Sequence, residues 1–276
     1  MDISERANQR IAALEAALVL NGRRRPDGPL YGGVDLGTAY IVTVVVDGQG
    51  TPVAGVLTRS QSSIRDGLVL DYVGAITILR RQVERLRGAG IPIQAAGAAY
   101  PPGTMGRNAQ AFGNAVEAVG LELTGLIDEP TAASLVLEIK DGAVVDIGGG
   151  TTGISVIKGG QVVYTADEPT GGVHVDLVLS GHFRIDVQEA EIIKRDPARQ
   201  AELFPLVRPV FQKMGTIVCE HLEGYPVESI YLVGGTSCFP GIEEVVASET
   251  GLKVARPLNP LLVTPLGIAL DCARRA

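Results

Sequence analysis

Two short stretches of the chain combine an acid, glycines and hydroxyl residues in an order that suits a magnesium-bound phosphate. The longer one runs from Val145 to Thr152: Asp146 ends an apolar run, three glycines follow, and two threonines come next. Glycines let backbone N–H groups come close to an anion, and a carboxylate beside them suits a magnesium ion held through water. A flexible hairpin with a glycine-rich tip is the competing interpretation, because such turns are common.

A second copy of the pattern lies upstream and favours the chemical interpretation. Residues Gly33 to Thr38 again place an acid, an apolar residue, a glycine and a threonine after an apolar run. Each copy leads into an apolar strand and then a tight turn, at Asp47–Gly50 and at Lys158–Gly160. Internal repetition carries more information than either motif alone. The sequence therefore predicts two facing hairpins that hold one phosphate chain between two domains.

The elements that would position these turns alternate between strands and helices. Apolar periodicity predicts helices over 4–20, 72–88, 112–119, 188–194, 199–223, 241–251 and 264–274, and strands over 93–99, 121–127, 229–233 and 252–255. The order β-β-β-α-β-α-β-α occurs twice, which indicates an α/β fold. Asp128 is a predicted helix cap with Pro130 close behind it. Gly171 and Gly172 open a helix that contains Asp176, a helix start that suits an anion.

The totals exclude several classes of protein. The chain has 276 residues, 46% of them apolar, which is enough for two moderate domains. Its net charge of −7 argues against nucleic acid as a partner, and the run Arg23–Arg25 is too short to change this. Three scattered cysteines form no metal or disulfide pattern. With no signal peptide and no long apolar run, we expect a cytoplasmic protein without a membrane span.

The N-terminal segment has two interpretations. Ile11, Leu14 and Leu18 form a narrow apolar stripe on the first predicted helix, and residues 21–29 form a linker rich in glycine, proline and charge. The helix either packs back on its own domain or serves as a docking peptide for a partner.

Five motifs, in order, resemble the actin-like ATPase superfamily, which includes Hsp70, bacterial actin-like proteins and sugar kinases. The two glycine turns are similar to its phosphate loops, and Asp128–Ala133 is similar to the connecting segment of Hsp70. The remaining matches are Gly171–Gly172 with Asp176, the helix Glu191–Arg195, and the adenosine loop Tyr231–Ser237. The resemblance covers most of residues 30–272. It implies a duplicated, ribonuclease H-like, two-lobed fold with a nucleotide cleft.

A closer resemblance is to the EutJ family of ethanolamine utilisation. It is carried by Arg65–Val69, Tyr100–Thr104, Asp128–Ala132, Ala166–Glu168 and Thr170–Gly172. The resemblance implies a chaperone-like, ATP-binding protein that assists ethanolamine ammonia-lyase or the shell proteins of a bacterial microcompartment. It also implies three parts: residues 1–29 as a helix and linker, 30–140 with 264–276 as lobe I, and 141–263 as lobe II.

The resemblance assigns roles residue by residue, with ATP or ADP and Mg²⁺ as the ligands. Asp35 and Asp146 hold hydrated Mg²⁺, and Glu129 orients the attacking water. The phosphates meet glycines and threonines of the two turns: Gly37, Thr38, Gly148, Gly149, Gly150 and Thr151. The nucleoside is framed by residues of a helix and of the adenosine loop: Glu191, Lys194, Gly234 and Gly235.

Three departures from the family pattern bear on the activity. Gly153 stands where relatives often carry an acid, and residues 60–100 offer no counterpart of the catalytic lysine of Hsp70. One long predicted helix between Glu191 and the adenosine loop indicates a trimmed outer subdomain in lobe II. We therefore expect a slow ATPase at most. The alternatives are a nucleotide-dependent scaffold or filament protein of the bacterial actin, FtsA or PilM type, and a small-molecule kinase.

Overall fold

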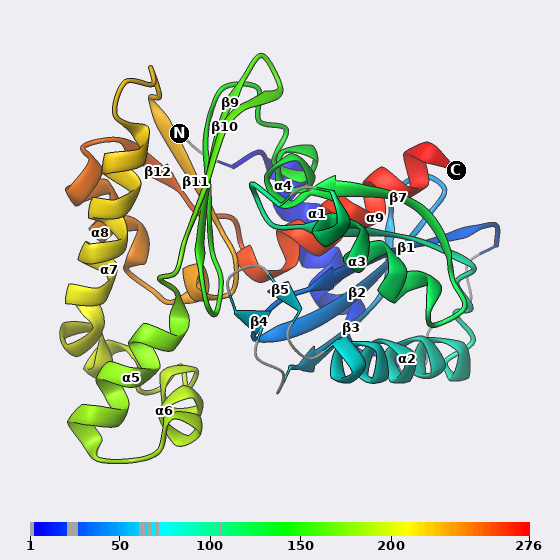
Figure 1. Ribbon diagram of the computed structural model, residues 1–276, viewed down its shortest axis with the longest axis horizontal. Helices are drawn as coiled ribbons and strands as arrows, with labels where there is room; N and C mark the ends of the chain where they lie inside the picture. The colour runs from blue at the N-terminus through cyan, green and yellow to red at the C-terminus, as the bar shows by residue number, and fades with distance from the viewer. Residues whose placement is uncertain (1–2, 21–26, 61–63, 66–67, 70–71, 105) are drawn as a thin grey trace. The chain divides into compact units, whose positions relative to one another are not determined.

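The chain folds into two compact units (Figure 1). The computed structural model describes residues 3–20, 27–60, 64–65, 68–69, 72–104 and 106–276. Of these, residues 3–139 and 262–276 form the first unit, and residues 140–261 form the second. The predicted linker falls mostly outside the described residues, as does the arginine run within it.

The first unit contains a five-stranded sheet and five helices among its described residues. Its strands are β1 (Leu30–Leu36), β2 (Tyr40–Asp47), β3 (Pro52–Arg59), β6 (Ala95–Tyr100) and β7 (Glu122–Asp128), with a separate short pair, β4 (Ile64–Arg65) and β5 (Leu68–Val69). Its helices are α1 (Glu5–Ala17), α2 (Tyr72–Gly88), α3 (Arg107–Glu117), α4 (Glu129–Leu137) and α9 (Val263–Arg275).

The second unit repeats this plan with its own sheet. Its strands are β8 (Gly142–Ile147), β9 (Thr152–Lys158), β10 (Gln161–Glu168), β11 (Ser229–Val233) and β12 (Lys253–Ala255). Its helices are α5 (Gly172–Phe183), α6 (Val187–Lys194), α7 (Gln200–Leu222) and α8 (Ile242–Thr250), with the short 3₁₀ turns η1 (Thr236–Cys238) and η2 (Pro260–Leu262), the latter at the boundary between the units.

The two sheets share one topology. Strands run in the order β3-β2-β1-β6-β7 in the first unit and β10-β9-β8-β11-β12 in the second. In each, a three-stranded antiparallel meander supplies the central strand, which then pairs in parallel with a strand that follows a helix. The predicted α/β class and its internal repeat are thus confirmed. Between α6 and β11 the described chain contains only α7, as the trimmed outer subdomain requires.

Some boundaries differ from the prediction. Helix α3 begins at Arg107, five residues before the predicted start, because its first turn is polar and mostly exposed and so gives no apolar signal. Helix α7 continues through Pro205 and Pro209 to Leu222, as predicted. Among the described residues, no helix is both long enough and apolar enough to cross a lipid bilayer.

Helix α1 packs within the first unit, so its apolar stripe is not an exposed docking peptide. Ile11 and Leu14 are fully buried, and α1 lies on β3 and beside α9. The approach is close because β3 offers a glycine there: a Cβ on Gly55 would lie 2.7 Å from Leu18 Cδ2 and 3.3 Å from Leu14 Cδ1. The docking interpretation is therefore wrong for this stripe, because Ile11 and Leu14 are part of the core and the half-buried Leu18 packs at Gly55.

Helix α9 reaches the sheet of the first unit from the far end of the chain. A Cβ on Gly33 of β1 would overlap the backbone nitrogen of Ala269, and one on Gly267 would overlap the carbonyl oxygen of Ala132 in α4. Such contacts are possible only where both partners bring backbone together. Helix α9 therefore fixes β1 and α4, the two elements that carry Asp35 and Glu129.

We expect Leu14→Ala to lower the free energy of unfolding by about 2–5 kcal/mol, since it leaves a cavity in a packed region. The matched control is Gln9→Ala on the exposed side of the same helix, where we expect a change within about 0.5 kcal/mol. Urea unfolding of both variants measures the difference. Equal, small effects would show that α1 contributes little to the stability of the first unit.

Candidate phosphate-binding site

The loop between β8 and β9 is a tight turn of three glycines and a threonine. The N–H of Gly148 donates to the carbonyl oxygen of Thr151 at 2.9 Å, which closes the turn. Strands β8 and β9 pair from Gly142–Ile157 to Ile147–Thr152, so the loop sits directly at the end of a regular hairpin. We call residues Gly148–Thr151 the phosphate loop.

Three hydrogen bonds hold the carbonyl oxygens of the phosphate loop. Gly148 O accepts from the N–H of Gly172 at 3.0 Å and from Thr236 Oγ1 at 2.7 Å. Gly149 O accepts from the N–H of Val173 at 2.8 Å. The first N–H groups of α5 are therefore used by the protein itself. This corrects the prediction that the Gly171–Gly172 helix start receives an anion: it holds the phosphate loop instead.

The direction of the loop N–H groups follows from these bonds. Within a trans peptide unit the C=O and the N–H of the next residue point in opposite directions. Because the carbonyls of Gly148 and Gly149 face α5 and Thr236, the N–H groups of Gly149 and Gly150 face away from them. Adjacent N–H groups on one side of a turn form a concave donor site for an anion. The loop thus presents two N–H donors on one side, an arrangement that suits an anion.

The glycines at the start of α5 are explained by how closely this turn approaches the loop. A Cβ on Gly171 would lie 2.8 Å from both Gly149 O and Thr151 N, and one on Gly172 would lie 2.5 Å from Thr236 Oγ1. Just before them, Thr152 Oγ1 donates to the carbonyl oxygen of Thr170 at 2.5 Å. Any side chain at these two glycine positions would push the phosphate loop out of place.

The Asp146 carboxylate packs against a further glycine, Gly234. Gly234 follows β11, which runs parallel to β8, and has a φ of +89°. A Cβ there would overlap Oδ1 of Asp146 and lie 2.6 Å from Ile147 O. Gly234 is therefore required both by its backbone conformation and by the space that the Asp146 carboxylate occupies.

A second carboxylate lies across the sheet from Asp146. Gly153 pairs with Asp146 on one side and with Asp167 of β10 on the other. Directly opposed residues of antiparallel strands point to the same face of the sheet, so both carboxylates share a face with no side chain between them. This is the position where the family pattern expects an acid, and Asp167 supplies one from the neighbouring strand.

These donors fit a magnesium ion better than a metal that needs a full set of protein ligands. Among the described residues, no group of three or more histidine, cysteine or acidic side chains is placed to hold a metal ion. Mg²⁺ usually keeps several waters and takes one or two carboxylates together with phosphate oxygens. Asp146 and Asp167 lie on either side of Gly153, which has no side chain, close to the phosphate loop. Two carboxylates in this arrangement are compatible with a hydrated magnesium ion.

The residues expected to frame the nucleoside lie in the same unit. Lys194 ends α6, and its Nζ lies 2.7 Å from Asp176 Oδ1 and 3.1 Å from Gly172 O. Glu191 lies one turn earlier, with its carboxylate 3.9 Å from Arg195. Gly235 follows Gly234 and leads into η1. The second unit therefore brings Asp146, the phosphate loop, Lys194 and Gly234 into one connected cluster.

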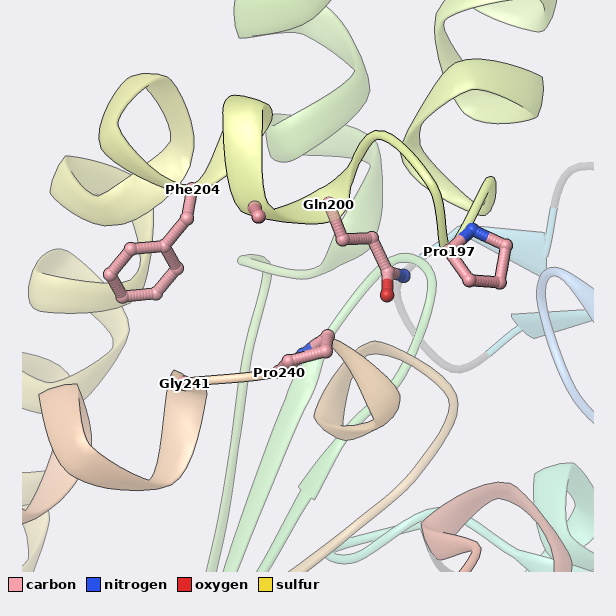
Figure 2. A pocket seen from close by; sticks show the side chains of 6 residues that line it. Pro197, Gln200, Phe204, Pro240 and Gly241 are labelled. Carbon is pink, nitrogen blue, oxygen red and sulfur yellow. The ribbon is translucent and has the colours of Figure 1, made fainter.

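A hollow of about 470 Å³ lies between the α6–α7 connection and the segment after η1 (Figure 2). Its walls are mostly apolar and come from residues that sequence reasoning did not single out: Pro197, Gln200, Ala201, Phe204, Pro240 and Gly241. Gln200 is the polar exception. Its Nε2 donates to Lys194 O at 3.3 Å, and Figure 2 shows its Oε1 on the side of Pro240.

The first unit holds the other predicted residues along one edge of its sheet. Asp35 is the penultimate residue of β1, and Gly37 and Thr38 form the turn that follows. A Cβ on Gly37 would lie 2.7 Å from Tyr40 O, so the turn requires a glycine. Glu129 begins α4 directly after β7. Because β1, β6 and β7 are parallel, their carboxyl ends meet at this edge.

Helix α4 is fixed at its start by the predicted cap. The Asp128 carboxylate accepts from the N–H of Thr131 at 2.9 Å, and Pro130 occupies the first turn. Asp128 also pairs with Tyr100 across β6 and β7. Burial and, secondarily, the Asp128 charge raise the pKa of Tyr100 above its usual value. The Tyr100 phenol is thus a neutral hydrogen-bonding group at this edge at neutral pH.

Comparison with known proteins places the chain among actin-like proteins. Two family models match: "MreB/Mbl protein" over residues 58–196 and "Cell division protein FtsA" over residues 143–267. The ethanolamine utilization protein EutJ of Salmonella typhimurium is 43% identical over 256 residues, which are 92% of this chain and 90% of that protein.

Solved structures agree with this placement. The crystal structure of EutJ from Carboxydothermus hydrogenoformans superposes with a TM-score of 0.90 at 47% identity, and covers 96% of this chain and 98% of that one. MreB5 of Spiroplasma citri, solved with ADP bound, has a TM-score of 0.68 at 19% identity and covers 88% of this chain and 95% of its own. The second likeness concerns the fold alone.

Gly171→Ala tests whether the start of α5 holds the phosphate loop. Its Cβ meets backbone atoms that cannot move independently, so we expect a loss of about 1–3 kcal/mol in the free energy of unfolding. Gly181→Ala, in the same helix with no atom within 4 Å of its Cβ position, should raise stability by about 0.5–1 kcal/mol. Urea unfolding distinguishes them, and similar changes in both variants would contradict the close contact.

Proposed function

The chain belongs to the family of the ethanolamine utilization protein EutJ, and from this premise we propose that it binds ATP and ADP with Mg²⁺ and hydrolyses ATP slowly. The observation that carries the proposal is the phosphate loop. Its carbonyls are held from behind, so the N–H groups of Gly149 and Gly150 are directed outward. Thr151 adds a hydroxyl beside them. The ADP bound to MreB5 of Spiroplasma citri, a protein of the same fold, supports a nucleotide as the ligand.

In this proposal the protein contributes carboxylates to a hydrated magnesium ion. Asp146 and Asp167 would hold its waters from the second unit, and the role of Asp35 stays a prediction of the family resemblance. When bound, the ion neutralises charge on the phosphate oxygens. Asp146 is oriented for this by the backbone of Gly234, against which its Oδ1 packs.

We assign the base of the nucleotide to the hollow beside the α6–α7 connection (Figure 2). Proline and phenylalanine walls suit the flat apolar faces of a purine. Gln200 adds selectivity because its amide nitrogen is engaged with Lys194 O, which leaves Oε1 as an acceptor for an exocyclic amino group. Adenine carries such a group, so the assignment favours adenine over a base with a carbonyl there.

We expect slow ATP hydrolysis because the first unit has no lysine that could serve as a catalytic residue. Glu129 offers a carboxylate that can accept a proton from an attacking water. Residues 3–139 and 262–276 contain fourteen arginines and no lysine, so a catalytic lysine is not available from this unit. Removing one preorganised electrostatic stabiliser costs on the order of 10²-fold in rate. Binding and slow release, rather than rapid turnover, are then the useful properties of the protein.

We place this nucleotide cycle in ethanolamine utilisation, as a chaperone-like aid to ethanolamine ammonia-lyase or to microcompartment shell proteins. The support is the family to which the chain belongs. Sedimentation with and without ATP separates this role from that of a filament-forming scaffold: an assembly aid stays in the supernatant in both conditions, and a filament sediments with ATP.

Calorimetric titration with Mg²⁺ and ADP tests the site. Asp146→Ala removes a ligand of the hydrated ion, and Gly149→Val obstructs the donor N–H groups, so each should weaken binding at least about tenfold. The matched controls are Glu244→Ala on the exposed surface of α8 and Gly88→Val, whose Cβ position has no atom within 4 Å. Wild-type affinity in both site variants would overturn the assignment.

Glu129→Gln tests the hydrolysis step. The substitution keeps the shape of the side chain and removes its basicity, so we expect a turnover at least about tenfold lower with nucleotide affinity preserved. Wild-type turnover itself should fall below the roughly 1 s⁻¹ at which typical kinases begin. Phosphate release under single-turnover conditions measures the hydrolysis rates of the wild type and of Glu129→Gln. The exposed Glu117→Gln is the control. An unchanged rate in Glu129→Gln would remove this residue from the mechanism.

A further inference from the structure

Lys194 occupies a position that the nucleoside-framing role does not explain. It is the last residue of α6, yet its ammonium group reaches the first turns of α5, 2.7 Å from Asp176 Oδ1 and 3.1 Å from Gly172 O. The Lys194 and Asp176 side chains are only 15% and 6% exposed. An ion pair removed from water to this degree survives only with good geometry and further hydrogen bonds, and the Gly172 carbonyl supplies one.

The place of this ion pair connects it to the phosphate loop. Gly172 receives the Lys194 ammonium on its carbonyl oxygen and donates its own N–H to Gly148 O at 3.0 Å. A single residue therefore separates Lys194 from the loop. A Cβ on Gly172 would also lie 3.2 Å from Lys194 Nζ, so the fit on this side is close as well, although less so than the 2.5 Å on the side of Thr236.

We propose that Lys194 is a positioning residue for the phosphate loop and not a ligand of the nucleoside, an inference that rests on the proposed nucleotide binding. An ammonium group has three N–H donors; one is given to Gly172 O, and the group forms a close ion pair with Asp176 Oδ1. The Asp176 carboxylate also neutralises its charge, which leaves little attraction for a phosphate. Lys194 acts through the turn at Gly172, whose N–H directs the loop.

Lys194 links the region proposed to bind the base with the phosphate loop, and both lie in the second unit. Helix α6 carries Glu191 and leads into the connection that lines the hollow, where Gln200 donates to Lys194 O. The side chain of the same lysine holds the turn behind the phosphate loop. A base bound in the hollow therefore restrains α6 through Gln200 and Lys194 O. Helix α6 in turn restrains the phosphate loop through the bond from Lys194 to Gly172. Full phosphate affinity requires this link, whereas binding of the base does not.

The test compares ADP with adenosine on the full-length chain. In Lys194→Met we expect Mg²⁺–ADP to bind about tenfold more weakly, the equivalent of one lost hydrogen bond to a charged phosphate. Adenosine, which lacks the phosphates, should bind within about twofold of wild type. Lys213→Met is the control, because Lys213 lies on the exposed surface of α7; it should leave both affinities unchanged.

A second variant covers a failure of Lys194→Met to fold with Asp176 left unpaired. The double change Lys194→Met with Asp176→Asn leaves no unpaired charge but still removes the donor to Gly172 O, so it should show the same selective loss for ADP. Equal losses for ADP and adenosine would mean that Lys194 contacts the nucleoside, and unchanged ADP binding would mean that the loop does not depend on it; either overturns the inference. A wild-type chain that binds neither ligand would instead overturn the proposed function.

Discussion

The hydrogen bonds from the start of α5 to the carbonyl oxygens of Gly148 and Gly149 are the constraint on which the second unit depends. They determine which way the peptide units of the phosphate loop face, and hence where its N–H groups point. A loop of three glycines left to itself samples many conformations. Two backbone N–H groups and the Thr236 hydroxyl restrict it to one, in which the donors are directed outward before a ligand arrives.

This constraint explains why several positions have no side chain. Gly171, Gly172 and Gly234 each lie where a Cβ would meet backbone, Thr236 or the Asp146 carboxylate. Their role is to let three segments, distant in the chain, come within hydrogen-bonding distance at the end of β8. The same logic operates in the first unit, where Gly33 and Gly267 admit α9 against β1 and α4. In both units, close backbone packing sets the positions of the acids.

The sequence predicted the features that are local. Hairpins around Asp35 and Asp146, the Asp128 cap and the repeated strand order follow from apolar runs, turn residues and caps that lie close together in the chain. It did not predict contacts that depend on packing. The stripe of α1 has the same pattern whether it is buried or exposed, and only its contact at Gly55 distinguishes the two.

The candidate site shows the same division between local and tertiary signals. The sequence identified the motif residues but not their contacts. The N–H groups of Gly172 and Val173 donate to carbonyl oxygens of the phosphate loop, and Lys194 forms an ion pair with Asp176. Asp167 was missed as a partner of Asp146 because the two are 21 positions apart and meet only through the register of β8, β9 and β10. The absence of a side chain at Gly153 was the available signal, since it leaves that face open to a neighbouring strand.

The most direct measurement is the amide spectrum of the ¹⁵N-labelled protein during titration with Mg²⁺ and ADP. If the N–H groups of Gly149 and Gly150 donate to phosphate, their signals move downfield as ADP binds. The amides of Gly172 and Val173, already bonded to the loop, should change little. Saturable ADP binding that leaves the Gly149 and Gly150 signals in place, or that shifts Gly172 and Val173 instead, would contradict the account.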